Sequence, residues 1–382
     1  MFLSEQDLAE LIIWRRNLHR RPELSGQEKE TAQAVQALLR ATGADEIVTE
    51  LGGHGVLGIY RGDALGPTIM LRAELDGLPI QETSARPHRS ITPGKAHLCG
   101  HDGHMTILAA VARGLGRKRP RCGQALLLFQ PAEEDGSGAA AVLADKKFDQ
   151  VQPDFVFALH NLPGLPLGHV AIADGLVNCA SRGMQIKLSG RTAHASNPEL
   201  GVSPQRAVVR LLSDITGLGR GGTLDQEFSM VTVTHARLGE PAFGISPGYA
   251  EVWLTLRTLT DARMETLRSS AEQLVRRVAD SERLEVDVVY RDVFGHCTNA
   301  PEAVARLKDA LDAEEIEYSG QGLPLRGSED FGLFNRRSRS AMFFLGAGVD
   351  HAGLHVSNYD FPDELIEIGS RVFMRTLRDL LG

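Results

Sequence analysis

Four short apolar runs, each followed directly by polar side chains, constrain the fold of this chain more than any other feature. They are Thr68 to Leu71, Ala125 to Phe129, Phe155 to Leu159 and Ala341 to Leu345. Apolar residues in these runs do not alternate with polar ones, which is typical of strands that are covered on both faces. The pattern therefore predicts an α/β domain built on a largely parallel sheet.

Helix start and stop patterns predict the elements that cover this sheet. Ser4-x-x-Asp7 is a capping pattern at the start of a helix near residues 4–20, and Ser25-x-x-Glu28 is expected to open a second helix. The remaining helices are expected near residues 104–117, 136–145, 301–313 and 363–381. Helices thus alternate with strands along the chain, as the crossovers of a parallel sheet require.

The chain between residues 178 and 296 has a different pattern. Apolar and polar residues alternate there, so that Val252, Leu254 and Leu256 share one face of a strand. Such alternation predicts an antiparallel sheet with one solvated face. Two helices expected to cover the other face lie near residues 204–218 and 261–280.

The length of 382 residues exceeds what one hydrophobic core usually holds, so two domains are expected. We predict a discontinuous α/β domain, residues 1–177 and 297–382. An α+β domain, residues 178–296, is inserted into it.

Polar clusters at the ends of the four apolar runs predict where a site lies. Glu74 and Asp76 follow the first run, Glu133 and Glu134 the second, and His160 the third. The fourth run leads into a loop that reaches His355. Because active sites of open α/β sheets lie beyond the carboxyl ends of the strands, these four segments are expected to converge.

The stretch 97–104 packs three imidazoles, a thiol and a carboxylate into eight residues. This density of soft and borderline donors favours a transition-metal site, with Cys99 and His101 as ligands. A catalytic cysteine with a histidine base is the alternative interpretation. Asp102 and His104 are predicted to hold the ligating imidazoles in place, since a ligating histidine needs its other N–H fixed.

Composition and charge exclude several classes of function. The formal net charge of −8 argues against a nucleic-acid or anionic-membrane surface. The first ten residues are acidic where a secretion signal would be basic, and no long apolar run follows. We therefore expect a cytoplasmic protein. The four cysteines form no closely spaced pairs, so a disulfide framework is not expected.

The chain resembles a known family, the aminoacylase, carboxypeptidase and hippurate-hydrolase group of dinuclear metallohydrolases (peptidase family M20). The resemblance is to its branch of hippurate hydrolases and indole-3-acetyl-amino-acid hydrolases in particular. It spans nearly the whole chain, because the matching stretches follow in the expected order. They are RRNLHRRPELSGQEKET (15–31), LRAELDGLPIQE (71–82), HLCGHDGHM (97–105), FQPAEEDGSGA (129–139), ALHNLPGLPLG (158–168), GRTAHAS (190–196), WLTLRT (253–258), GSEDFG (327–332), LH (354–355) and YDFPDE (359–364).

The resemblance implies a zinc-peptidase-like fold and a site that holds two divalent metal ions, with Mn or Zn expected and Co or Ni also suited. The implied metal ligands are Cys99, His101, Glu134, His160 and His355. Glu133 is the implied general base, which fits a carboxylate beside a metal-activated water. His194, from the inserted domain, matches the histidine that stabilises the developing oxyanion, often from a partner subunit.

Other positions carry weaker implications. Arg257 lies where the family often has an arginine for the substrate carboxylate, but a strand arginine in a surface ion pair is the competing interpretation. Asp76 belongs to a motif that supports the ligands in this branch. Glu74 and Gly77 depart from the usual Asp and Ala there. The segment Ser84 to Lys95 is unexpectedly basic, and it either lines the mouth of the site or is an exposed loop.

The resemblance implies a metal-dependent amidohydrolase that cleaves N-acyl amino acids. The inserted domain would be a lid that also forms a homodimer. A dipeptidase or carboxypeptidase with the same site is the alternative enzyme, because the same water could attack either amide. A catalytically silent, metal-binding homologue is a third hypothesis, and the joint presence of all proposed ligands and the base argues against it.

Overall fold

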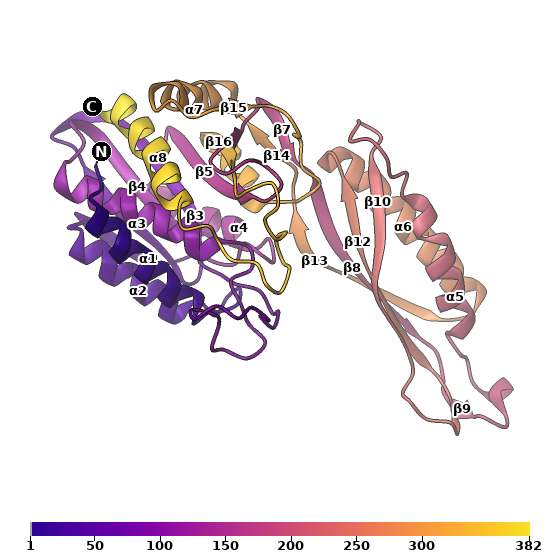
Figure 1. Cartoon of the computed structure of the whole chain (residues 1–382). Helices are drawn as coiled ribbons and strands as arrows, with labels where there is room; N and C mark the ends of the chain where they lie inside the picture. The colour runs from indigo at the N-terminus through magenta and orange to yellow at the C-terminus, as the bar shows by residue number, and fades with distance from the viewer. Residues whose placement is uncertain (1) are drawn as a thin grey trace. The chain divides into compact units, whose positions relative to one another are not determined.

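The computed structural model describes residues 2–382, which form two compact units (Figure 1). The first unit contains the chain up to Val177 together with Thr298–Leu323 and Asp330–Gly382. The second contains Asn178–Cys297 and Pro324–Glu329. Among the helices of residues 2–382, none combines the length and apolarity needed to cross a bilayer.

An eight-stranded sheet forms the centre of the first unit. In their order across the sheet its strands are β1 (Glu46–Leu51), β2 (Gly55–Arg61), β4 (Cys122–Gln130), β3 (Ala64–Glu74), β5 (Phe155–Leu162), β16 (Arg339–Gly346), β6 (Val170–Ala171) and β15 (Tyr318–Ser319). The four predicted runs are the parallel strands β4, β3, β5 and β16 at its centre. The predicted fold class is therefore confirmed.

Helices cover the sheet of the first unit. They are α1 (Glu5–His19), α2 (Lys29–Ala41), α3 (His101–Arg117), α4 (Gly138–Ala144), α7 (Pro301–Ala313) and α8 (Leu365–Leu381), with short 3₁₀ turns at Phe148–Gln150 and Asp330–Arg336. Helix α3 packs against α1, α8 and strand β3, and nearly all of its residues are buried. This central helix begins with His101, three residues before the predicted start.

The first capping prediction is confirmed and the second is wrong. Ser4 and Asp7 form a reciprocal capping box at the start of α1. Helix α2 begins at Lys29 without a side-chain cap. Ser25 instead donates its hydroxyl hydrogen to Asp76 Oδ2, 2.7 Å away.

The second unit contains the predicted antiparallel sheet. Its strands, in spatial order, are β10 (Ser229–Leu238), β12 (Tyr249–Thr258), β8 (Ala180–Ser189) and β13 (Glu285–Phe294). The inward residues of β8 and β12 pack against α5 (Gln205–Asp214) and α6 (Asp261–Ser281) in one apolar core. Shorter elements are β9 (Ala193–His194), β11 (Ile245–Ser246) and the 3₁₀ turns Pro198–Leu200 and Thr216–Leu218. Strands β7 (Gly175–Asn178) and β14 (Cys297–Asn299) lie where the sequence passes from one unit to the other.

Candidate metal centre

The predicted metal ligands and the predicted base all lie in the first unit, at the carboxyl ends of its central strands. Glu133 and Glu134 follow β4, and His160 is near the end of β5. His355 lies on the loop 347–364 between β16 and α8. Cys99 immediately precedes the turn that opens α3 at His101. The parallel topology thus brings together segments that are up to 256 residues apart.

Two sets of donor atoms meet at the thiol of Cys99. In the first set, Cys99, His101 and His160 place one donor atom each within 4.8 Å of one another, and Cys99 Sγ is 3.4 Å from His160 Nε2. In the second set, Cys99, Glu134 and His355 also place one donor atom each within 4.8 Å of one another. His355 Nε2 lies 3.3 Å from Cys99 Sγ and 3.6 Å from Glu134 Oε2. One thiol therefore belongs to two adjacent three-donor groups.

Hydrogen bonds fix the orientation of the imidazoles of His101 and His160. His101 Nδ1 donates to the carbonyl oxygen of Asp76 at 2.9 Å, and His160 Nδ1 donates to the carbonyl oxygen of Asn161 at 2.8 Å. Each ring consequently directs an Nε2 lone pair toward the donor cluster. His101 Nε2 is buried and has no hydrogen-bond partner among residues 2–382. Because buried polar atoms are normally satisfied, this orientation fits a bound cation.

The carboxylates around His101 make the cluster electronegative. Burial lowers the pKa of His160 to about 3, so this ring is neutral. Burial also opposes charge on His101, but the Asp76 carboxylate, 3.4 Å from its Nδ1, and the charge of Glu74 outweigh it and raise the pKa of His101 to about 10. Positive charge is therefore favoured at this position, whether a proton or a metal ion supplies it.

Unusual backbone conformations place the donors. Gly100 has a φ of 95°, and a Cβ atom there would lie 2.1 Å from Asn161 Oδ1. Ala132, just before Glu133, has a φ of 50°, and His355 has a φ of 64°. Non-glycine residues at positive φ are strained, and such strain concentrates at functional sites. The His355 amide donates to Leu98 O at 2.8 Å, which holds it beside the Cys99 turn.

The three residues predicted to support the ligands have different surroundings. Asp76 Oδ2 accepts from the Glu134 amide at 2.9 Å, so Asp76 contacts two of the predicted ligands, His101 and Glu134. His104 Nδ1 lies 2.7 Å from Glu74 Oε2. His104 Nε2 lies 2.7 Å from Asn161 Oδ1, beside His160.

Asp102 lies in a second buried network, away from the donor atoms. Its Oδ2 accepts from Arg15 Nη1 at 2.8 Å and lies 3.0 Å from His19 Nδ1. Asp102 therefore anchors the start of α3 to α1, and the structure shows no hydrogen bond from it to a predicted ligand within residues 2–382. Arg15 and His19 were not predicted for the site, although a charged residue on the inner face of a helix was a usable indication.

A fully buried arginine, Arg72, begins the motif Arg72-x-Glu74-x-Asp76 that was predicted to support the ligands. Arg72 is 1% exposed and contacts Glu74. Its Nη2 donates to Asp330 Oδ1 at 2.6 Å, and its Nε donates to Gln130 Oε1 at 3.0 Å. Glu74, at the position that departs from the family pattern, thus joins this arginine to His104.

His194 and Arg257 lie in the second unit. The Ser196 amide donates to His194 Nδ1 at 3.1 Å, so in the neutral ring the hydrogen is on Nε2, and the residue is exposed. Arg257 Nη1 donates to the carbonyl of Arg326 at 2.6 Å and to Ser328 Oγ at 2.7 Å. Arg257 thus holds the segment Pro324–Glu329 against its own unit.

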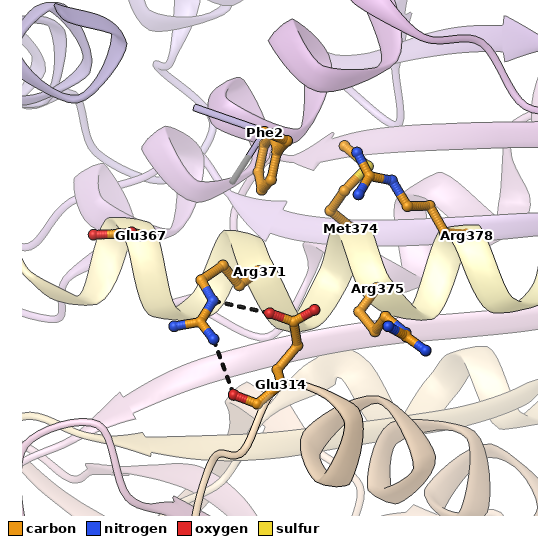
Figure 2. A pocket seen from close by; sticks show the side chains of 7 residues that line it. All are labelled: Phe2, Glu314, Glu367, Arg371, Met374, Arg375 and Arg378. Carbon is orange, nitrogen blue, oxygen red and sulfur yellow. Dashed lines mark hydrogen bonds and ion pairs between the residues drawn. The ribbon is translucent and has the colours of Figure 1, made fainter. Parts of the chain in front are cut away.

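A pocket beside α8 does not involve the donor cluster (Figure 2). Arg371 lies in it and donates to the side chain and the backbone of Glu314. The lining residues are Phe2, Glu314, Glu367, Arg371, Met374, Arg375 and Arg378. None of them was predicted for the site.

The fold and the donor set place the chain in the class of zinc-peptidase-like α/β enzymes. The family model of peptidase family M20/M25/M40 matches residues 70–379. An N-acetyldiaminopimelate deacetylase from Bacillus subtilis (strain 168) is 31% identical over 94% of this chain and 94% of its own length. A hippurate hydrolase from Campylobacter jejuni is 30% identical over 92% of this chain and 91% of its own length.

A solved structure is similar throughout. A dinuclear metal-binding peptidase of the M20 family from Bacillus subtilis has a TM-score of 0.80 at 24% identity, covering 99% of both chains. The chain belongs to peptidase family M20/M25/M40. The family assignment that its motifs predicted is therefore confirmed.

Proposed function

We propose that this protein is a metal-dependent amidohydrolase that cleaves N-acyl amino acids into a carboxylic acid and a free amino acid. The observation that carries the proposal is the sharing of Cys99 between two three-donor groups, one completed by His101 and His160 and the other by Glu134 and His355. This arrangement suits two adjacent divalent cations. Curated relatives named for hydrolysis of hippurate and of an N-acetyl amino acid support the substrate class.

The mixed sulfur, nitrogen and oxygen donors fit Mn²⁺ or Zn²⁺, with Co²⁺ and Ni²⁺ as further candidates. When bound, the cations would polarise the scissile carbonyl and lower the pKa of an attacking water. Cys99 would hold its thiolate between the two positions. His101 and His160 would hold their Nε2 atoms in place through their Nδ1 hydrogen bonds.

Glu133 is the proposed general base. Its side chain is 7% exposed, and its Oε2 lies 3.9 Å from His101 Nε2, so it borders the donor cluster in a largely dry environment. Glu133 would take the proton of the attacking water and then deliver it to the leaving amine nitrogen. The adjacent Glu134 has a different task, because its carboxylate lies by His355.

The second unit would contribute to the same reaction. The inserted domain, residues 178–296, is the proposed lid and dimerisation domain, and residues 1–177 and 297–382 are the proposed catalytic domain. His194 would donate its Nε2 hydrogen to the oxyanion, because Ser196 occupies Nδ1. Arg257 is the proposed group for the substrate carboxylate. A homodimer and a cytoplasmic location complete the proposal.

The test is release of free amino acid from N-benzoyl, N-acetyl and indole-acetyl amino acids by Mn²⁺-reconstituted protein, with simple dipeptides assayed alongside. We expect cleavage of N-acyl compounds that a chelator abolishes. Glu133→Gln should lower kcat by at least about 10²-fold and retain both cations, whereas Glu134→Gln should lose one. Cleavage of dipeptides alone would favour a dipeptidase instead. No cleavage by metal-loaded protein would contradict enzymatic function.

A further inference from the structure

His355 differs from the other predicted ligands in its support. Its side chain is 49% exposed, and it lies on the loop 347–364, which contains no helix or strand. Cys99 and His101 are buried. A loop of this kind has few internal constraints on its position. Contacts from elsewhere in the first unit must therefore hold His355 near Cys99 and Glu134.

The segment 82–90 makes such contacts just after His355. The Thr83 amide donates to the carbonyl of Ser357 at 2.8 Å. The hydroxyl groups of these two residues are also 2.8 Å apart. A backbone bond and a side-chain bond thus fix the chain two residues beyond His355.

Two side chains of the same segment, Arg86 and His88, converge on Asp360. Arg86 Nε lies 3.2 Å from Asp360 Oδ2, and His88 Nε2 lies 2.9 Å from the same oxygen. The other carboxylate oxygen accepts from the buried Arg15 Nη1 at 2.9 Å. Asp360 is only 8% exposed, so its contacts with Arg15 and His88 are partly shielded from water, whereas the Arg86 side chain is 41% exposed and contributes less.

The segment 82–90 is itself folded around a buried carboxylate. Glu82 is 6% exposed. It accepts from Ser84 Oγ at 2.5 Å and from the Ser90 amide at 2.7 Å. His19 Nε2 on α1 lies 3.4 Å from it. The segment therefore contacts both helix α1, through Glu82, and the His355 loop, through Thr83, Arg86 and His88.

We propose that segment 82–90 is a positioning clamp for His355, with Thr83, Arg86 and His88 as its positioning residues. The basic segment noted in the sequence would then set the affinity of one of the two cation positions, the one formed by Cys99, Glu134 and His355. This proposal depends on the proposed function in one respect, because it takes His355 to be a metal ligand. It gives the arginine and histidine of this otherwise unassigned segment a role at the site.

The test compares a double variant of the clamp with a single variant of an exposed arginine in the same turn. Arg86→Ala/His88→Ala removes the two side chains of the segment that contact Asp360, and Arg89→Ala is the control that removes a neighbouring exposed arginine. Mn²⁺ is titrated calorimetrically into the chelator-treated full chain. Loss of a group that orients a ligand typically costs 10- to 100-fold in metal affinity. We expect about 10-fold weaker binding of one cation, unchanged binding of the other, and no change in the control.

Hydrogen exchange supplies a readout that is independent of metal. The His355 amide, bonded to Leu98 O, should exchange faster in the double variant and at the wild-type rate in Arg89→Ala. In Thr83→Val, which keeps the side-chain shape and should fold normally, the His355 amide should also exchange faster. Equal weakening of both cations, or double-variant behaviour matching the control, would overturn the clamp. Retention of both cations by His355→Ala would instead overturn the ligand assignment in the proposed function.

Discussion

Replacing Gly100 with alanine tests whether the turn between Cys99 and His101 depends on a close approach to Asn161. The chain offers a matched control in Gly164. Gly100 has a φ of 95° and Gly164 a φ of 92°, so both substitutions impose nearly the same backbone strain. A Cβ atom at position 100 would lie 2.1 Å from Asn161 Oδ1, whereas nothing lies within 4 Å of one at position 164. The difference between the two variants isolates the contact.

The expected magnitudes follow from this geometry. Alanine at such a φ costs about 1–2 kcal/mol at either position. In Gly100→Ala the Asn161 side chain must also move, which breaks its buried hydrogen bonds with His104 and Tyr359. A buried hydrogen bond left unsatisfied costs about 1–3 kcal/mol. Gly100→Ala should therefore destabilise the first unit by about 2 kcal/mol more than Gly164→Ala does.

Urea unfolding monitored in the first unit measures this difference, and metal content is measured on the same samples. Gly100→Ala should also lose metal, because the Asn161 side chain holds His104, whose ring packs against His160 with centroids 4.8 Å apart. Gly164→Ala should keep its metal. Equal destabilisation of the two variants would show that the side chain of Asn161 does not constrain the turn. Unchanged metal content in Gly100→Ala would refute the link from the turn to His160.

Three further predictions concern the buried charges and the cations. Arg72→Met should lower the free energy of unfolding by about 3–5 kcal/mol, because the buried carboxylates of Glu74 and Asp330 lose their guanidinium; a loss below about 1 kcal/mol in urea unfolding contradicts this. Burial opposes charge on His19, but Asp102 outweighs it and raises the pKa of His19 to about 9. The protonated His19 ring therefore stabilises the folded protein fully below about pH 6.5, and this stabilisation is lost as the pH rises through about 9. The thermal midpoint of the wild type should fall across that pH range, and the midpoint of His19→Gln should fall less. Chelation should lower the unfolding free energy of the first unit by about 2.7 kcal/mol relative to protein with free metal at 100 times Kd, and an unchanged midpoint in calorimetry would argue against tightly bound cations.

The sequence predicted the sheet centre well because hydrophobic patterning decides it. Runs without alternation became β4, β3, β5 and β16, and alternating runs became the antiparallel sheet of the second unit. The hairpin of β1 and β2 was missed, as were β6 and β15. Strands of two residues, such as β6, carry too few side chains to show a period.

The convergence of the candidate ligands was predictable for a topological reason. Carboxyl ends of parallel strands meet at one edge, so polar residues after β4 and β5 had to lie near each other. The contacts of Arg15 and Arg72 were not predictable in this way. Arg15 meets Asp360, 345 residues away, and Arg72 meets Asp330, 258 residues away. No local pattern encodes such pairs, because only the packed fold brings their partners together.

The failed helix cap shows how local and tertiary bonds compete for the same side chains. Ser25 and Glu28 have the spacing of a capping box, which is worth about 0.5–2 kcal/mol. In the structure Ser25 donates to the fully buried Asp76, and the buried Glu28 accepts from the Ala132 amide at 2.8 Å. A buried carboxylate or amide without a partner costs about 1–3 kcal/mol or more, whereas water can satisfy an uncapped helix end. The tertiary bonds therefore prevail, and the residues that would have capped α2 instead support Asp76 and the turn that carries Glu133.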